Sequence, residues 1–202
     1  MSAGEPAPDV APTAKKRTRD PDRAAKVLDA ARRLFYERGY HAVTVDEIGQ
    51  AAGATGAALY RYFAGKEELL STLFDEALDR YLVAIPAPTD DPRRDVEELV
   101  DRHLRITLEE RELGSIWAHE HRALSPAHER RLARRTGQYV DRWVAVLRGA
   151  FPARDDGDLY AAAGAAIGTT TSLVARPGRV ISEREQEIVR RMVVAGLLDL
   201  AN

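Results

Sequence analysis

Apolar residues recur at helical spacing from about residue 20 to the end of the chain, and prolines, glycines and capping residues interrupt them repeatedly. Residues three and four apart share one face of an α-helix, so this spacing predicts amphipathic helices that each bury one face. No segment shows sustained apolar and polar alternation with β-branched enrichment, which is the pattern of a half-buried strand. The sequence therefore predicts an all-α fold.

Start and stop signals set the bounds of these helices. The pairs Asp20-Pro21, Asp91-Pro92 and Ser125-Pro126 each put proline at a first helical position, and Thr44 and Ser182 each open a capping box. Glycine or proline closes most of the segments. The expected helices cover approximately residues 21–38, 45–52, 55–63, 66–85, 92–108, 115–124, 126–151, 156–176 and 183–200.

Composition excludes several classes of protein. The chain contains no cysteine, which rules out disulfides, thiolate zinc sites and cysteine nucleophiles. No apolar stretch approaches the roughly 18 residues that span a bilayer. The first residues show no apolar segment behind a basic start, as a secretory signal would. We expect a cytoplasmic protein that does not contact a membrane.

Enzyme signatures are weak. Residues 119–121 read His-Glu-His, which places the two imidazoles on different helix faces, and no His-Glu-x-x-His spacing occurs. No glycine-rich phosphate loop follows a strand, and no Gly-x-Ser-x-Gly elbow is present. The sequence predicts a protein that is not an enzyme and has no metal or cofactor.

Charge divides the chain. Residues 14–66 carry eleven basic and six acidic side chains, whereas residues 67–202 carry 19 basic and 24 acidic ones. All four lysines (Lys15, Lys16, Lys26 and Lys66) lie in the basic part. This asymmetry favours a polyanion-binding head on a body that binds no polyanion.

Residues 44–63 have the pattern of a helix-turn-helix unit. Two short helices are joined at Gly53, and the second can lie in a DNA major groove while the first crosses the backbone. The small residues 56–58 at the start of the second helix allow close approach to the base edges. The alternative is an interaction or adaptor protein in which this unit is only structural.

The stretch from Arg23 to Leu70, and above all its LYRYF…KEELL block, resembles the DNA-binding domain of the TetR family of bacterial transcriptional repressors. The resemblance implies a homodimer, a diverged ligand-binding domain, and release of operator DNA when a small molecule binds. It divides the chain into a flexible basic arm (1–19), a helix-turn-helix domain (20–66) and a helical ligand-binding and dimerisation domain (67–202). Gly56 and Ala57 depart from the residues common in the family, which leaves fewer side chains that reach the bases.

The resemblance also supplies the DNA-binding residues. Thr44 would meet a phosphate at the start of the first short helix, and Arg61 would read guanine. Ala58 would contact a thymine methyl group, and Tyr62 either contacts DNA or packs in the core. The arm, residues 15–19, would lie along the DNA backbone or enter the minor groove. The expected DNA-binding residues are Thr44, Thr55, Gly56, Ala58, Tyr60, Arg61, Tyr62 and Lys66.

A small-molecule site is expected among the middle helices, where aromatic side chains accompany a few polar groups. Residues 117–124 also resemble a stretch of family members linked to lipid or acyl-thioester metabolism. The expected ligand residues are Trp117, Glu120, His121, Tyr139, Trp143 and Thr170, with His103, Arg122, Thr169 and Thr171 as further candidates.

The last two helices are expected to form a homodimer. Residues 159–168 are mostly small, and residues 188–198 form a wide apolar face, so two such helices from each subunit would make a four-helix bundle. The alternative is burial of these faces inside one subunit. A twofold dimer predicts an approximately palindromic DNA operator. The helix over residues 66–85 links head and body, and its tilt would couple ligand to DNA.

Overall fold

The computed structural model describes residues 21–201. The expected arm, residues 1–19, and the capping residue Asp20 lie outside the described residues.

The described part of the chain is all-α, as predicted, and it contains no strand. Three short 3₁₀ turns follow α6, α8 and α9. None of the described helices is long and apolar enough to cross a membrane. The helices are α1 (Pro21–Arg38), α2 (Val45–Ala51), α3 (Gly56–Leu59), α4 (Lys66–Ala84), α5 (Pro92–Glu109), α6 (Arg111–Glu120), α7 (Pro126–Ala150), α8 (Asp156–Thr171) and α9 (Glu183–Leu198).

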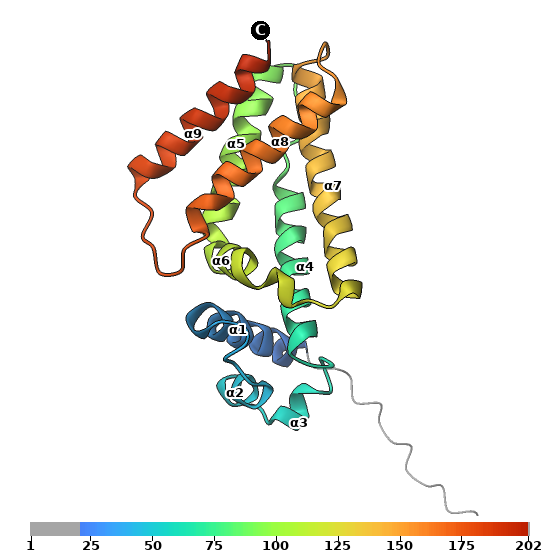
Figure 1. Ribbon diagram of the computed structural model, residues 1–202, viewed down its shortest axis with the longest axis vertical. Helices are drawn as coiled ribbons and strands as arrows, with labels where there is room; N and C mark the ends of the chain where they lie inside the picture. The colour runs from blue at the N-terminus through green and yellow to red at the C-terminus, as the bar shows by residue number, and fades with distance from the viewer. Residues whose placement is uncertain (1–20, 202) are drawn as a thin grey trace, which may run out of the picture.

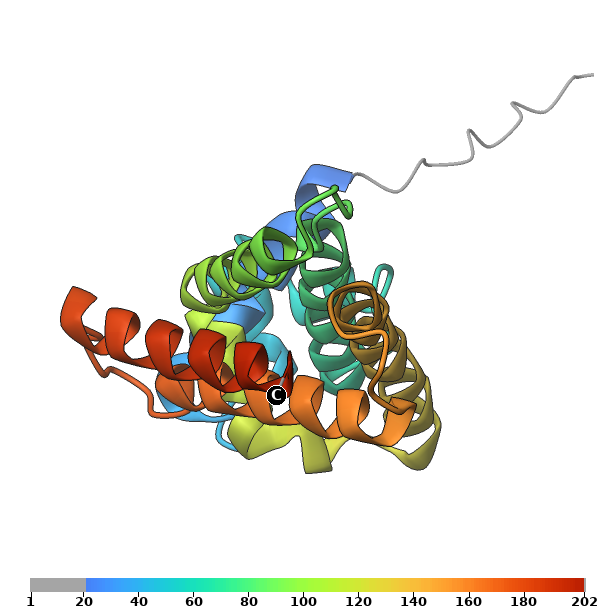
Figure 2. The same cartoon turned by 90° about the horizontal axis from the view of Figure 1, so that it is seen from above.

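The helices α1, α2 and α3 form a head at one end of the molecule, and α4 runs from this head into a body made of α4 to α9 (Figure 1). Within the body, α8 packs against both α7 and α9. Seen from above, α8 and α9 lie together on one side of the body (Figure 2). Head and body are therefore joined by a continuous helix.

The helix ends follow the local signals. Thr44 and Ser182 form the predicted capping boxes of α2 and α9, which satisfy amide groups that have no partner inside the helix. Gly39 and Gly53 follow α1 and α2 with φ angles of +80° and +67°, a conformation that side chains with a Cβ rarely adopt.

Two apolar clusters form most of the core. The first joins the head to the first half of α4 and to α6, and the second packs α5, α7, α8 and α9 together around Trp143. Because the first cluster runs through residue 66, packing does not mark a boundary there. The division at residues 66 and 67 stays a prediction.

Three helix bounds differ from expectation. The helix α3 ends at Leu59 rather than near residue 63, because the Tyr62 N–H donates to the Leu59 carbonyl (2.9 Å) in a tighter turn. The helix α6 begins at Arg111, directly after α5, and no side chain caps it, so the sequence carries no start signal there. Beyond Thr171 the chain tightens into a 3₁₀ turn, which ends α8 early.

Candidate nucleic-acid interface and ligand cavity

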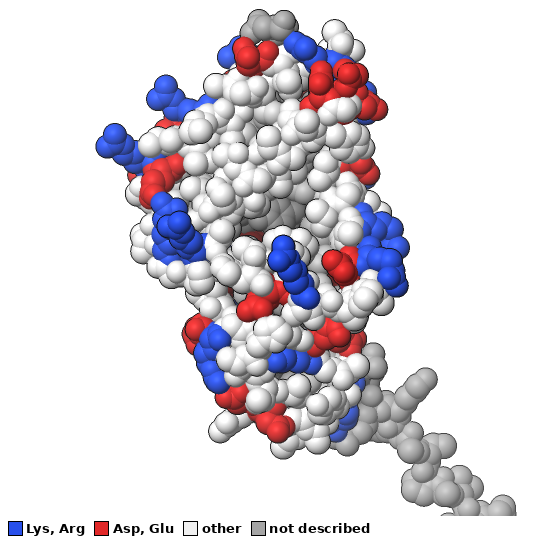
Figure 3. Space-filling view, viewed as in Figure 1, with Lys and Arg blue, Asp and Glu red and all other residues white. Residues whose placement is uncertain are grey.

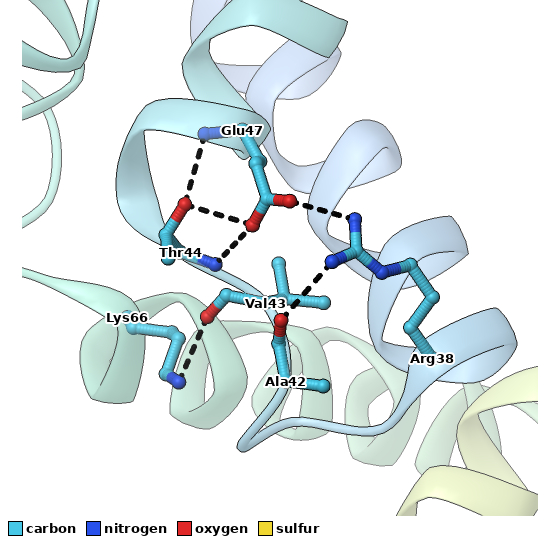
Figure 4. A network of polar contacts seen from close by, with 6 residues as sticks. All are labelled: Arg38, Ala42, Val43, Thr44, Glu47 and Lys66. Atoms are coloured by element: carbon cyan, nitrogen blue, oxygen red, sulfur yellow. Dashed lines mark hydrogen bonds and ion pairs between the residues drawn. The ribbon is translucent and has the colours of Figure 1, made fainter.

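The N-terminus of α2 is held by a network around Thr44 (Figure 4). The Thr44 N–H donates to Glu47 Oε2 (2.8 Å), and the Glu47 N–H donates to Thr44 Oγ1 (3.3 Å). Arg38 pairs with Glu47 Oε1 (2.8 Å) and donates to the Ala42 carbonyl (3.1 Å). These bonds, chiefly those from Thr44, lower the pKa of Glu47 to about 2. Thr44 is exposed to solvent, and its bonds to Glu47 hold it in one position.

Lys66 binds the turn that precedes α2. Its ammonium group donates to the carbonyls of Tyr40 (2.8 Å) and Val43 (2.9 Å) and lies 4.3 Å from the centre of the Tyr40 ring. The bond to Val43 is visible in Figure 4. An ammonium group has three N–H donors, so these bonds leave one for another partner. The geometry gives Lys66 a positioning role next to Thr44.

The helices α2 and α3 approach each other so closely that the position of Gly49 favours glycine. A Cβ on Gly49 would lie 3.0 Å from the Gly56 nitrogen and 3.1 Å from the Thr55 carbonyl carbon. A Cβ on Gly56 would lie 2.0 Å from Asp46 Oδ1. The space over Gly56 is occupied by the Asp46 carboxylate, a flexible side chain that would have to turn away to admit a Cβ.

The remaining predicted DNA-binding residues gather on and after α3. Thr55 caps α3 by accepting from the Ala58 N–H (3.2 Å), and Tyr60 and Arg61 are exposed, with 58% of Tyr60 accessible. Ala58 is half-buried. Tyr62 is half-buried against the head core, in line with its core alternative. Exposed threonine, tyrosine and arginine side chains at the free end of the head can donate to phosphates and base edges.

Where head and body meet, α6 is bonded to the head and α4 is bonded to the start of α7. Glu120 Oε1 accepts from the Tyr40 N–H (3.1 Å), in the same turn that Lys66 binds. Glu67 Oε1 accepts from the Ser125 N–H (2.6 Å) and lies 2.7 Å from His128 Nδ1. Its bonds to Ser125 and His128 lower the pKa of Glu67 to about 2.

A second contact reaches the head from the loop between α8 and α9. The Gly178 N–H donates to Tyr36 Oη on α1 (2.8 Å). The head is therefore bonded to several separate elements of the body.

The body contains a cavity of about 180 Å³ between α4, α5, α6, α7 and α8. In the space-filling view the surface of the body is hollowed, and uncharged residues form most of the rim (Figure 3). The residues that line the cavity are Phe74, Ala77, Leu78, Tyr81, His103, Glu110, Leu113, Gly114, Trp117, Thr136, Tyr139, Ile167 and Thr171.

Two of the six predicted ligand residues, Trp117 and Tyr139, line this cavity. Trp143 is fully buried beside His103, with ring centroids 5.2 Å apart, and Thr170 donates to carbonyls of its own helix. These two do not line the cavity.

The other two predicted ligand residues also lie outside the lining. Glu120 binds the head, and His121 stacks on Trp117 at a ring distance of 5.1 Å. That Glu120 and His121 bind the ligand stays a prediction, and neither residue lines the observed cavity.

Sequence reasoning missed the contribution of α4. Phe74, Ala77, Leu78 and Tyr81 line the cavity at spacings of three, one and three residues. This is the spacing of an ordinary core face, and nothing in the sequence separates a core face from a cavity wall. Glu110, paired with Arg80 at 2.5 Å, was also missed.

Burial changes the acid–base behaviour of the cavity wall. It lowers the pKa of His103 to about 4 and raises that of Tyr81 to about 12. Burial also raises the pKa of Tyr139. All three side chains are therefore uncharged at neutral pH. Across residues 21–201, no three His, Asp or Glu side chains gather closely enough to hold a metal ion.

Two family models match the chain, the first ending within α4 and the second beginning after it. The model of the bacterial regulatory proteins of the tetR family matches residues 27–73, which include the whole helix-turn-helix unit. The model of the tetracyclin repressor-like C-terminal domain matches residues 89–174, which include the cavity wall from α5 to α8. The chain belongs to the TetR family.

Individual relatives agree with the TetR assignment. The regulator HbdR of Aromatoleum sp. (strain CIB) is 31% identical over 78 residues, which are 39% of this chain and 34% of HbdR. The crystal structure of PfmR from Thermus thermophilus has a TM-score of 0.71 at 25% identity, and the match covers 85% of this chain and 96% of PfmR.

A third comparison concerns a complex. AibR, solved with isovaleryl coenzyme A and operator DNA, has a TM-score of 0.69 at 21% identity, with 86% of this chain and 96% of that chain covered. At that identity the likeness concerns the fold. The sequence match to HbdR spans about a third of that relative.

Proposed function

We propose that this TetR-family chain is a ligand-responsive transcriptional repressor. In this proposal a homodimer binds a palindromic operator through the two heads and leaves it when a small molecule enters the cavity of the body. The observation that carries the proposal is the continuity of α4, which begins at Lys66 in the head and lines the cavity from Phe74 to Tyr81.

The head supports the DNA-binding part of the proposal. Arg61 is exposed after α3 and would read guanine with its two parallel N–H groups. Thr44 would donate to a phosphate at the α2 N-terminus, where the helix dipole favours a negative charge. Thr55 and Tyr60 would add contacts to the DNA backbone, and Ala58 would contact a thymine methyl group. Lys66 would act by holding the turn before Thr44.

The body supports the dimer. No charged side chain occurs from Leu159 to Ala175, and in Figure 3 a broad uncharged area covers α8. Tyr160, Ile188 and Met192 are 44%, 48% and 62% exposed, which is unusual for large apolar side chains. Two copies of α8 and α9 would bury these side chains in a four-helix bundle.

Two contacts support coupling between cavity and DNA. The cavity is lined by Trp117 of α6, and the same helix ends at Glu120, which binds Tyr40 in the head. A ligand that shifts α4 or α6 would therefore move the turn that presents Thr44. By linkage, a ligand that weakens DNA binding must itself bind more weakly to the DNA complex.

The direct test of DNA binding is selection from a random duplex library, followed by anisotropy titrations over a salt series. We expect a palindromic sequence with half-site centres about 10 base pairs apart, preferred over random duplex by roughly 10³ or more. Arg61→Ala should lose about 1–3 kcal/mol of that preference. Arg105→Ala removes the same charge at an exposed position of α5 and should leave the preference unchanged. A library without an enriched sequence would contradict the proposal.

The dimer is tested by sedimentation velocity. Met192→Glu puts a charge on the uncharged face and should give a monomer. Val83→Glu changes an even more exposed apolar residue, 83% accessible on α4, and should leave the dimer intact. A dimeric Met192→Glu variant would contradict the assignment of this face.

A further inference from the structure

We propose that the ligand of the cavity is a small, uncharged and largely apolar molecule that donates a hydrogen bond from a hydroxyl group. The inference rests on the proposed ligand-responsive function of the cavity. It concerns the chemistry that the cavity wall selects, which the family assignment leaves open.

Two hydroxyl groups of the wall already donate their hydrogens to other protein atoms. Tyr81 Oη donates to Thr107 Oγ1 (3.1 Å), away from the cavity, and Thr171 Oγ1 donates to the Ile167 carbonyl (2.9 Å) in its own helix. A hydroxyl group has one hydrogen and two acceptor lone pairs. After these bonds, Tyr81 and Thr171 offer the cavity only acceptors.

The pair of His103 and Tyr139 gives the same result. His103 Nδ1 and Tyr139 Oη are 2.6 Å apart, so one of them donates to the other. His103 Nε2 completes no hydrogen bond. A phenol hydroxyl is a stronger donor than a neutral imidazole, and an imidazole nitrogen is a stronger acceptor than a phenol oxygen, so Tyr139 donates to Nδ1 and the imidazole proton lies on Nε2. Tyr139 Oη then also presents a free lone pair.

Electrostatics argue against a charged ligand. The pKa of His103, lowered by burial to about 4, leaves the imidazole neutral at pH 7 and unable to pair with an anion. The carboxylate of Glu110, also in the wall, is already paired with Arg80 and is not free to compensate a cation. Moving an uncompensated charge out of water into this mostly apolar space is costly. An uncharged donor meets the acceptors without that cost.

The size of the cavity fits one substituted ring or a chain of similar volume. An engineered apolar cavity of about 150 Å³ binds benzene. The volume here is about 180 Å³, and the rings of Phe74, Trp117 and Tyr139 line it. Ring faces and edges at these positions favour stacking with an aromatic ligand. A methylated phenol is therefore a suitable probe.

The test compares four probes of one shape by isothermal titration calorimetry at pH 7. These are para-cresol, para-xylene, para-toluate and para-methylbenzylammonium, which carry a hydroxyl donor, no polar group, an anion and a cation on the same ring. We expect para-cresol to bind about three- to tenfold more tightly than para-xylene, as one net hydrogen bond implies. We expect it to bind at least roughly tenfold more tightly than either ion.

Tyr139→Phe removes the acceptor and keeps the ring. This variant should bind para-cresol and para-xylene equally well, with para-xylene affinity as in the original protein. Tyr36→Phe makes the same change on α1, outside the cavity lining, and should keep the full difference. If Tyr139→Phe fails to fold, Tyr81→Phe, which removes a second acceptor in the wall, should reduce the difference.

The outcomes separate this inference from the proposed function. Tighter binding of either ion, an unchanged preference in Tyr139→Phe, or no binding of any probe by a protein that still selects an operator would overturn the ligand chemistry alone. A protein that binds para-cresol as expected and selects no DNA would overturn the proposed function and leave the cavity chemistry standing.

Discussion

In the head, α2 and α3 approach until a Cβ on Gly49 would lie 3.0 Å from backbone, whereas the body leaves about 180 Å³ of space between five helices. The exposed carboxylate of Glu47 in the head is fully bonded, but His103 Nε2 and Trp143 Nε1 in the body are buried without a partner. Buried polar atoms without partners cost stability and are commonly linked to function. The comparison indicates that the DNA-binding surface of the head is already fixed, whereas the body keeps space and polar atoms for a ligand.

The largest effect should come from the close contact in the head. Gly49→Ala places a methyl group against backbone atoms of residues 54–56, which cannot rotate away. We expect a loss of about 3 kcal/mol of stability and loss of operator binding, measured by urea unfolding and anisotropy.

Gly137→Ala is the matched change in the body. No atom lies within 4 Å of a Cβ at this exposed position on α7, so helix propensity should raise stability by about 1 kcal/mol. Similar losses in both variants would remove the distinction between a tightly packed head and a loosely packed body.

The next effect concerns His103. Unfolded His103 binds a proton below about pH 6.5, whereas the folded imidazole stays neutral down to about pH 4. The free energy of unfolding should therefore fall as the pH is lowered through this window, by about 3 kcal/mol from this residue. His103→Gln, which does not titrate, should show a shallower pH dependence. Parallel curves for the two proteins would show that His103 is not held neutral.

A smaller effect is expected at the junction of head and body. Glu120→Ala leaves the Tyr40 N–H without its acceptor, which should cost about 1 kcal/mol because the bond is partly buried. Glu120→Gln keeps an oxygen acceptor and should retain most of that stability. Equal losses in the two variants would indicate that the carboxylate charge matters rather than this hydrogen bond.

The smallest effect should be at the surface of the body. Arg148 pairs with Asp156 at 2.7 Å, and half or more of each side chain is exposed. Exposed ion pairs contribute little, so Arg148→Ala should change the free energy of unfolding by less than about 0.5 kcal/mol in a urea titration. A loss of stability as large as that of Glu120→Ala would show that this exposed ion pair contributes as much as a partly buried hydrogen bond.

The sequence predicted the head better than the body. Capping residues such as Thr44 and glycines such as Gly53 act within a few residues of where they stand, so their effects are local and readable. The cavity brings together residues as far apart as Phe74 and Thr171, and their meeting depends on helix packing that no local pattern encodes. Thr170 and Thr171 illustrate this limit. They are adjacent on α8, yet only Thr171 lines the cavity.

Lys66 shows a related limit. The family resemblance implied that Lys66 contacts DNA, which stays a prediction, but the chain also brings two carbonyls of a turn more than twenty residues earlier within hydrogen-bond distance. Position in a motif predicted the place of this side chain and not its partners.

In the proposed function, the cavity and the DNA interface form one coupled unit through α4 and α6. Amide hydrogen exchange with and without a selected operator duplex tests it without a known ligand. Coupling requires that DNA binding alter the cavity, so we predict changed protection in α6 and in the cavity-lining turns of α4 (residues 74–81) as well as in the head. Changes confined to α1, α2 and α3 would contradict the account.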